Sequence, residues 1–234
     1  MSYYLSIAGY IVGLPLELLI IAALVRGSFR EYPWVFAYVI AEFLGTVIEM
    51  PLALAYYHTR DLHLGKRFSL WYWGDETVQE FLILIVVISL IWHATGSARS
   101  RRTIRMALVT AVTLFAGVSL LLHYDASVPM GRWMTYWTRD LNFGAAILDM
   151  VLWAMLIAKR QKDSRVLMLS AGLGIMFAGE AIGQSVRSFE THESIIGLVG
   201  SVLVMITYLA FLYIWWQTFR VPRAVPLVSP VKLS

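Results

Sequence analysis

Six carboxyl groups lie well inside the long apolar runs of this 234-residue chain, where acidic side chains are rare. They are Glu17, Glu42, Glu49, Glu80, Asp149 and Glu180. A charged side chain at the centre of a membrane helix costs about 2.5 to 3.5 kcal/mol even on insertion scales, so each of these acids needs a physical reason. A carboxyl group in that setting can bind a proton or a cation, or can accept hydrogen bonds from a cationic or polyhydroxyl solute.

Helical spacing gathers these acids onto polar faces, because residues three and four apart share one side of a helix. One such stripe consists of Tyr38, Glu42, Gly45, Thr46 and Glu49. Another consists of Glu180, Gly183, Gln184 and Arg187. The economical arrangement is one polar interior, widest toward the outside, in which Arg187 pairs with Glu180 or Glu49.

The predicted site has two overlapping sets of residues. The set expected to bind a ligand is Glu42, Glu49, Glu80, Asp149, Glu180, Gln184 and Arg187. The set expected to relay protons or cations is Glu17, Glu42, Glu80 and Asp149, each about 13 Å from one end of its helix at a rise of 1.5 Å per residue. An alternative is that the acids are protonated or hydrogen-bonded and only hold helices together.

The elements that carry these acids are apolar runs of bilayer length, since a hydrocarbon core of about 30 Å needs roughly 20 apolar residues. They are predicted at residues 4–25, 34–57, 71–92, 104–123, 133–158, 166–186 and 195–216. Most tryptophans fall near the ends of these runs, where indole rings favour the headgroup layer. The sequence thus predicts an all-α protein with seven transmembrane helices.

Composition supports this class, because 59% of the residues are hydrophobic, 15% are charged, and the mean hydropathy is +0.69. A soluble domain of this length leaves too much surface in water to carry such a composition. The 19 lysines and arginines concentrate in the connections after the first, third, fifth and seventh runs. The positive-inside rule then places the amino terminus outside and the carboxyl terminus inside, most simply in a plasma or inner membrane.

The two ends of the chain show a possible internal repeat. Glu17 corresponds to Asp149, Glu42 to Glu180, Gly45 to Gly183 and Glu49 to Arg187. The halves would be residues 1–95 and 133–217, joined by a linking helix at 104–123, within one domain of residues 1–217. Three prolines spaced four residues apart predict an extended cytoplasmic tail over 218–234.

Several classes of function lack the residues they need. The absence of cysteine excludes thiol chemistry, and the five histidines lie at run ends or in loops without the spacing of a metal motif. Microbial rhodopsins share a seven-helix layout, but Lys66, Lys159, Lys162 and Lys232 lie in predicted loops or the tail, which excludes a retinal Schiff base. We therefore expect no cofactor and no bound metal. An intramembrane enzyme is disfavoured, because the sequence shows no recognisable set of metal ligands or of a nucleophile with its base.

The leading functional hypothesis is a transporter of a small solute, coupled to protons or cations, with an acidic cavity in the outer half of the bundle. The alternative is a receptor-like sensory or accessory subunit that binds a ligand from outside and acts through a membrane-protein partner. Expected partners are membrane lipid, a small molecule or cation, and a second membrane protein or further copies of the chain. The basic pI is explained by the lysines and arginines in the connections that orient the chain in the membrane. No nucleic acid partner is therefore expected.

Overall fold

The computed structural model describes residues 2–59, 62–95, 98–128, 130–158, 163–188 and 195–220. Throughout these residues the structure is helical, with short connections and no strands. The helices are α1 (Ser2–Ala23), α2 (Pro33–Thr59), α3 (Leu62–Thr95), α4 (Ala98–His123), α5 (Met130–Ala158), α6 (Ser164–Ser188) and α7 (Ile195–Arg220). All 7 are long and apolar enough to cross a membrane, which confirms the predicted integral membrane class. The predicted tail from residue 221 onward lies outside the described residues.

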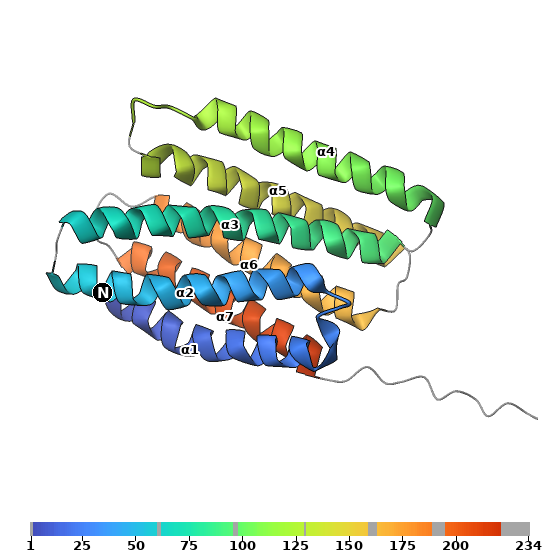
Figure 1. The fold of residues 1–234 in the computed structure, drawn as a ribbon, viewed down its shortest axis with the longest axis horizontal. Helices are drawn as coiled ribbons and strands as arrows, with labels where there is room; N and C mark the ends of the chain where they lie inside the picture. Colours follow the sequence, from blue (N-terminus) through green and yellow to red (C-terminus); the bar gives the residue numbers. More distant parts are fainter. Residues whose placement is uncertain are drawn as a thin grey trace, which may run out of the picture.

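Six of the helices close into a ring in the order α1, α2, α3, α5, α6, α7 and back to α1. The fourth helix, α4, lies at the edge of the bundle, against α5 and α3 (Figure 1). The start of α1 lies at one end of the bundle, here called the N-terminal end, and the turn between α1 and α2 lies at the other (Figure 1). We call this other end the basic end, because Arg26, Arg165 and Arg220 lie there.

The helix α3 begins at Leu62, nine residues before the run predicted at 71–92. Gly65, Lys66 and Arg67 lower the hydropathy of this stretch, so a search for apolar runs stops at Trp71 although the helical backbone continues. The placement of Lys66 in a loop was therefore wrong. Lys66 is exposed near the start of α3 and still lies away from the bundle interior, while the other three lysines are outside the described residues.

The first helix ends in a π-helical turn, η1 (Leu24–Ser28), in which Gly27 has a φ of +156°. Side chains rarely adopt this backbone conformation, so a glycine is favoured there. The turn redirects the chain from α1 toward α2. Leu24, at its start, is fully buried.

The basic end of the ring is filled by an apolar core. Its members come from α1, α2, α3, α5, α6 and α7, and include Leu24, Tyr32, Leu90, Ile91, Leu152, Leu156, Leu169 and Phe219. The second half of α3 is almost completely buried in this core. The interior at this end is therefore closed by packed side chains.

Two tryptophans depart from the expected interfacial pattern. Trp215 is fully buried, and its Nε1 donates to the Leu169 carbonyl oxygen at 3.0 Å. Trp137 is nearly buried and donates to the Ala116 carbonyl oxygen at 3.1 Å. Both indoles thus join neighbouring helices, α7 to α6 and α5 to α4. Trp92 and Trp216 agree better with an interfacial position, since arginine guanidinium groups cover their rings.

The connection from α4 to α5 is held by Asp125. Its Oδ1 accepts hydrogen bonds from the Ser127 hydroxyl at 2.6 Å and from the Ser127 backbone N–H at 2.8 Å. These two bonds to the charged form lower the pKa of the Asp125 carboxyl. Their contribution to the loop is therefore present at neutral pH and is lost as the pH falls through this lowered pKa.

Glycines allow α6 to approach α7 closely. A Cβ atom at Gly179 would overlap Thr207, and one at Gly183 would overlap Val204 and lie 2.9 Å from the Gly200 carbonyl oxygen. Gly9 and Gly13 likewise face Met205 and Tyr208 of α7. Both GxxxG pairs of the sequence thus pack inside the bundle.

We expect Gly183→Leu to lower the thermal stability of the protein in detergent, because the Gly200 backbone cannot move aside. Overpacking of this kind costs about 1–3 kcal/mol. The matched control is Gly117→Leu on α4, where an added Cβ has no neighbour within 4 Å. Equal melting temperatures for the two variants would contradict this account of α6–α7 packing.

Candidate functional site

Three helices meet at the hydroxyl group of Tyr208. This oxygen lies 3.0 Å from Glu17 Oε1 and 2.8 Å from Glu42 Oε1, so α7 connects α1 with α2. We call this group the Tyr208 bridge. A hydroxyl has one proton and can donate to only one of the two carboxylates. The second contact is a hydrogen bond only when that carboxyl carries a proton and donates to the tyrosine oxygen. The Tyr208 bridge is thus a geometry that holds an acid proton.

A second bridge joins three further helices. The Asn142 side-chain amide of α5 donates to Glu80 Oε1 of α3 at 3.3 Å and to Glu180 Oε2 of α6. An amide group has two N–H donors, so it can serve both carboxyls at once. We call this group the Asn142 bridge. It brings two like-charged side chains together, which disfavours simultaneous ionisation of both.

Tyr38 connects the two bridges. It lies one turn before Glu42 on α2, hydrogen-bonds the Glu42 carboxyl, and is within electrostatic range of Glu80 and Glu180. Its ring is nearly buried and packs edge-on against Phe211 and Trp215. The aromatic packing fixes the hydroxyl between the Tyr208 bridge and the Asn142 bridge. Four of the predicted acids therefore form one connected cluster, consisting of Glu17, Glu42, Glu80 and Glu180.

A third acidic group lies nearer the N-terminal end. Glu49 hydrogen-bonds Tyr10 and is close to Asp75, and Glu76 is close to both of these acids. Asp75 reaches α2 at Gly45, where a Cβ atom would overlap its carboxyl group. Interactions of Asp75 with Glu42, and of Glu76 with Glu80, connect this group to the two bridges. The acids thus form a series from the N-terminal end toward the middle of the ring.

Two oxygens of the connected cluster are buried without a hydrogen-bond partner in the described part of the chain. They are Glu17 Oε2 and Glu80 Oε2. A buried ionised oxygen without a partner is unfavourable by several kcal/mol, whereas a protonated carboxyl has no net charge to solvate. Within the same residues, neither of the two ion pairs involves an acid of the cluster.

The structure does not bring every predicted site residue into this cluster. Asp149 is buried on α5, and its Oδ1 accepts from the Ser170 hydroxyl of α6 at 2.5 Å. Arg139 of α5 is exposed, with its guanidinium 5.2 Å from the centre of the Tyr136 ring. Gln184 and Arg187 belong to α6, but their side chains lie outside the described residues, as does any pairing of Arg187 with Glu180 or Glu49.

Sequence reasoning missed Asp75 as a member of the site. With the third span starting at Trp71, Asp75 falls in its first turn, where an acid needs no special explanation. The polar stretch Asp75–Gln79, opposite Gly45, was the available signal. The bridging roles of Tyr208 and Asn142 depend on packing between helices, which spacing within one helix does not reveal.

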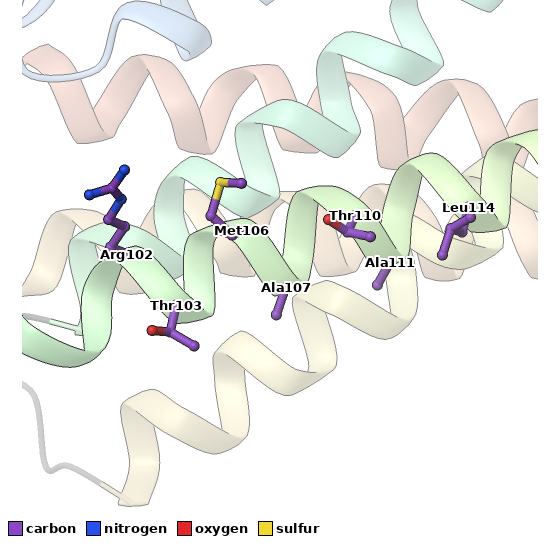
Figure 2. A pocket seen from close by; sticks show the side chains of 7 residues that line it. All are labelled: Arg102, Thr103, Met106, Ala107, Thr110, Ala111 and Leu114. Carbon is purple, nitrogen blue, oxygen red and sulfur yellow. The ribbon is translucent and has the colours of Figure 1, made fainter.

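The described pockets lie away from the acids. A shallow groove of about 640 Å³ runs along α4 and is lined only by residues of that helix, as Figure 2 shows for Arg102, Met106 and Leu114. A second pocket lies at the basic end. No group of three His, Cys, Asp or Glu with metal-binding geometry occurs among the described residues.

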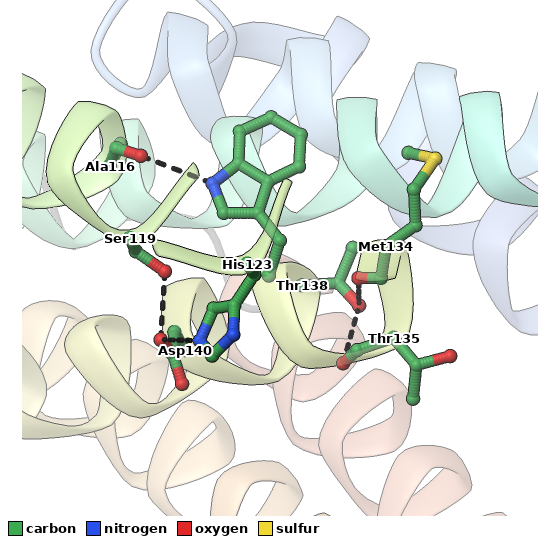
Figure 3. Close-up of polar contacts among 8 residues, drawn as sticks. Ala116, Ser119, His123, Met134, Thr135, Thr138 and Asp140 are labelled. Carbon is green, nitrogen blue, oxygen red and sulfur yellow. Dashed lines mark hydrogen bonds and ion pairs between the residues drawn. The ribbon is translucent and has the colours of Figure 1, made fainter. Parts of the chain in front are cut away.

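A serine, a histidine and an aspartate meet between α4 and α5 (Figure 3). The Ser119 hydroxyl donates to Asp140 Oδ2 at 2.7 Å, and His123 Nε2 lies 2.9 Å from the same oxygen. In a hydrolytic triad the histidine stands between serine and aspartate, where it can take the serine proton. Here the aspartate stands in the middle. The arrangement clamps α4 to α5 and differs from the order of a hydrolytic triad.

We expect Asp140→Ala to destabilise the attachment of α4, because it removes the acceptor of both side chains. Bonds to a charged group contribute about 1.5–3 kcal/mol each in soluble proteins and less within membranes. The matched control is Asp125→Ala, whose bonds stay within its own loop. Thermal unfolding in detergent should show a larger loss for Asp140→Ala, and an equal loss would contradict the clamp.

Comparisons with known proteins place the chain in no family. No family model, no curated protein and no solved structure matches it. The functional argument therefore depends on the side-chain geometry alone.

Proposed function

We propose that the protein is a proton-coupled membrane transporter of a small solute, in which the Tyr208 bridge and the Asn142 bridge hold the coupling protons. The observation that carries the proposal is the contact of one tyrosine hydroxyl with two carboxyls, that of the buried Glu17 at 3.0 Å and that of the half-buried Glu42 at 2.8 Å. That geometry requires an acid proton for both contacts to be hydrogen bonds. Loss of the proton would leave two like charges on adjacent helices.

Proton binding at these bridges is coupled to helix packing. The Tyr208 bridge joins α1, α2 and α7, and the Asn142 bridge joins α3, α5 and α6. Every helix of the ring therefore supplies one group. Ionisation of both carboxyls of a bridge adds repulsion between helices, and at the Tyr208 bridge it also removes the donor of one contact. Protonation of one carboxyl relieves the repulsion and restores that contact. A proton can thus shift the balance between two arrangements of the ring, as alternating access requires.

The entry path for protons and solute would follow the acids from the N-terminal end. Glu49, Asp75 and Glu76 lead toward the two bridges. Beyond the bridges, the apolar core closes the basic end. The excess of arginine and lysine at that end supports an inside location for it under the positive-inside rule, and the proposed membrane is a plasma or inner membrane. The solute would then be a cationic or polyhydroxyl molecule, because carboxyl groups line its path.

The repeat of the sequence belongs to this proposal. Its central pair, Glu42 and Glu180, lies in the same cluster, on opposite sides of Tyr38 in the chain of interactions. In the repeat, α1 corresponds to α5 and α3 corresponds to α7. The contact between α1 and α7 is then equivalent to the contact between α5 and α3, and both contacts are present. The other pair, Glu17 and Asp149, bonds to tyrosine in one half and to serine in the other.

The alternative function is a receptor-like sensory or accessory subunit that binds a ligand at the acidic end. The closed core at the basic end favours it, because a subunit that signals through a partner does not need a path through the bundle. The two functions differ in whether protons or solutes cross the membrane.

We expect proteoliposomes to dissipate an imposed proton gradient faster than empty liposomes, as followed with an internal pH-sensitive dye. Sodium, potassium, a polyamine and a sugar would be added one at a time as candidate co-substrates. Glu42→Gln and Glu180→Gln should each reduce the flux to the rate of empty liposomes. Asp149→Asn is the matched control, since this acid is also inside the bundle, is buried, and lies outside the cluster, and it should retain flux.

Two results would contradict the proposal. If the folded wild type shows no flux with any co-substrate, transport is wrong and the subunit alternative gains support. If Glu42→Gln and Glu180→Gln conduct like Asp149→Asn, the bridges do not hold the coupling protons.

A separate prediction concerns the tyrosine hydroxyl. Tyr208→Phe keeps both carboxyls but removes the group that lets them share a proton, so we expect slower flux than in the wild type. Tyr213→Phe, which removes an exposed hydroxyl of the same helix, is the control and should leave the flux unchanged. Equal rates for the two phenylalanine variants would show that the bridge plays no part in proton movement.

A further inference from the structure

A pocket of about 490 Å³ opens at the basic end, between the end of α1 with its turn η1 and the end of α7. Its lining includes none of the acids of the two bridges, although Leu19 lies two residues after Glu17. Its lining is Leu19, Ala22, Ala23, Arg26, Gly27, Ser28, Glu31, Arg165, Trp216, Phe219 and Arg220. The pocket thus combines three arginines with a largely apolar wall.

The charges of the pocket do not balance. Glu31 is the one acid among its lining residues, and it pairs with Arg165, whose Nη1 lies 3.6 Å from Glu31 Oε2. The same nitrogen donates to the Ser28 hydroxyl at 3.3 Å. Within the described residues, neither Arg26 nor Arg220 forms an ion pair with an acid. Two guanidinium groups are therefore left to attract an anion from outside the chain.

Two exposed guanidinium groups, those of Arg26 and Arg220, line the opening of the pocket. Arg220 is exposed, and its guanidinium lies 5.1 Å from the centre of the Trp216 ring, which limits its freedom. Arg26 is exposed one residue before Gly27, where an added Cβ would meet nothing within 4 Å. Guanidinium groups bind phosphate oxygens with paired, charge-assisted hydrogen bonds.

The wall below the rim is apolar. Leu19, Ala22 and Ala23 of α1 face the pocket on one side, and Trp216 and Phe219 of α7 on the other. Both helices are candidate membrane spans, so the wall continues into the hydrocarbon region. A ligand with a phosphate group and an attached hydrocarbon chain would match the rim and the wall together. Basic pockets between membrane helices are known to bind anionic lipid headgroups.

We propose that this pocket binds a phosphate group through Arg26 and Arg220, and that its natural source is the headgroup of an anionic phospholipid. Arg165 contacts Glu31 and Ser28, so it adds positive charge to the site, while Arg26 and Arg220 supply the N–H donors for the phosphate. The site is independent of the proton bridges, because the apolar core lies between them.

The test uses purified full-length protein in detergent. Thermal stability and native mass spectra would be recorded with phosphatidylglycerol, with phosphatidylcholine, and with the soluble ester glycerol 3-phosphate. We expect saturable stabilisation and a bound-lipid mass with phosphatidylglycerol, and no saturable effect with phosphatidylcholine. Arg26→Gln with Arg220→Gln should weaken phosphatidylglycerol binding at least about tenfold, as the loss of charge-assisted bonds implies.

The matched control is Arg30→Gln with Arg105→Gln, two exposed arginines that lie over Phe29 and Trp92 and do not line the pocket. This pair should bind phosphatidylglycerol like the wild type. If the double pocket variant does not fold, each single variant is measured, since both side chains are exposed.

The three ligands distinguish a phospholipid headgroup from a soluble ester as the source of the phosphate. Binding of phosphatidylglycerol that glycerol 3-phosphate does not displace supports the lipid, and stabilisation by glycerol 3-phosphate alone supports the phosphate site with a soluble ester as its ligand. Equal binding of phosphatidylcholine and phosphatidylglycerol would overturn the proposal. So would equal losses in the pocket and control variants.

Discussion

The structure of the bundle interior depends on how its carboxyl groups are stabilised, either by a bound proton or by hydrogen-bond donors. Hydrocarbon cannot solvate an ionised acid, and within the described residues no ion pair reaches the central cluster. The donors that the described residues supply to it are neutral, namely the hydroxyls of Tyr38 and Tyr208 and the amide of Asn142. Neutral donors can stabilise these acids without fixing their charge. The cluster therefore keeps the ability to gain and lose protons.

The same constraint explains the distribution of packing in the bundle. Large apolar side chains concentrate at the basic end, whereas the acids occupy the stretch from the N-terminal end to the middle of the ring. Close packing at one end holds the helices together while the acidic part depends on exchangeable protons. Such a division fits a protein that changes shape on one side of a closed core.

The sequence was sufficient for the class, the number of spans and four acids of the cluster, because cost of burial and helical periodicity are local properties. It was not sufficient to predict which side chain each acid contacts on a neighbouring helix. Glu17 and Asp149 occupy similar positions in their runs, yet one meets a tyrosine of the cluster and the other a serine outside it. Trp215 likewise lies at a span end but points into the core. Which neighbour a side chain meets depends on the rotation of each helix, and spacing along one helix does not specify it.

The separation of acids from arginines is itself informative. Had Arg26 or Arg220 reached the carboxyl cluster, opposite charges would have neutralised one another inside the chain. In the described structure, the apolar core keeps them apart, and only Glu31 and Arg165 pair across neighbouring elements at the basic end. Where the described residues supply no opposite charge, such a group can be neutralised from outside the protein. For buried carboxyls the smallest available partner is a proton, and for interfacial guanidinium groups the nearest anions are lipid phosphates. The two proposed sites thus follow from one feature of the fold.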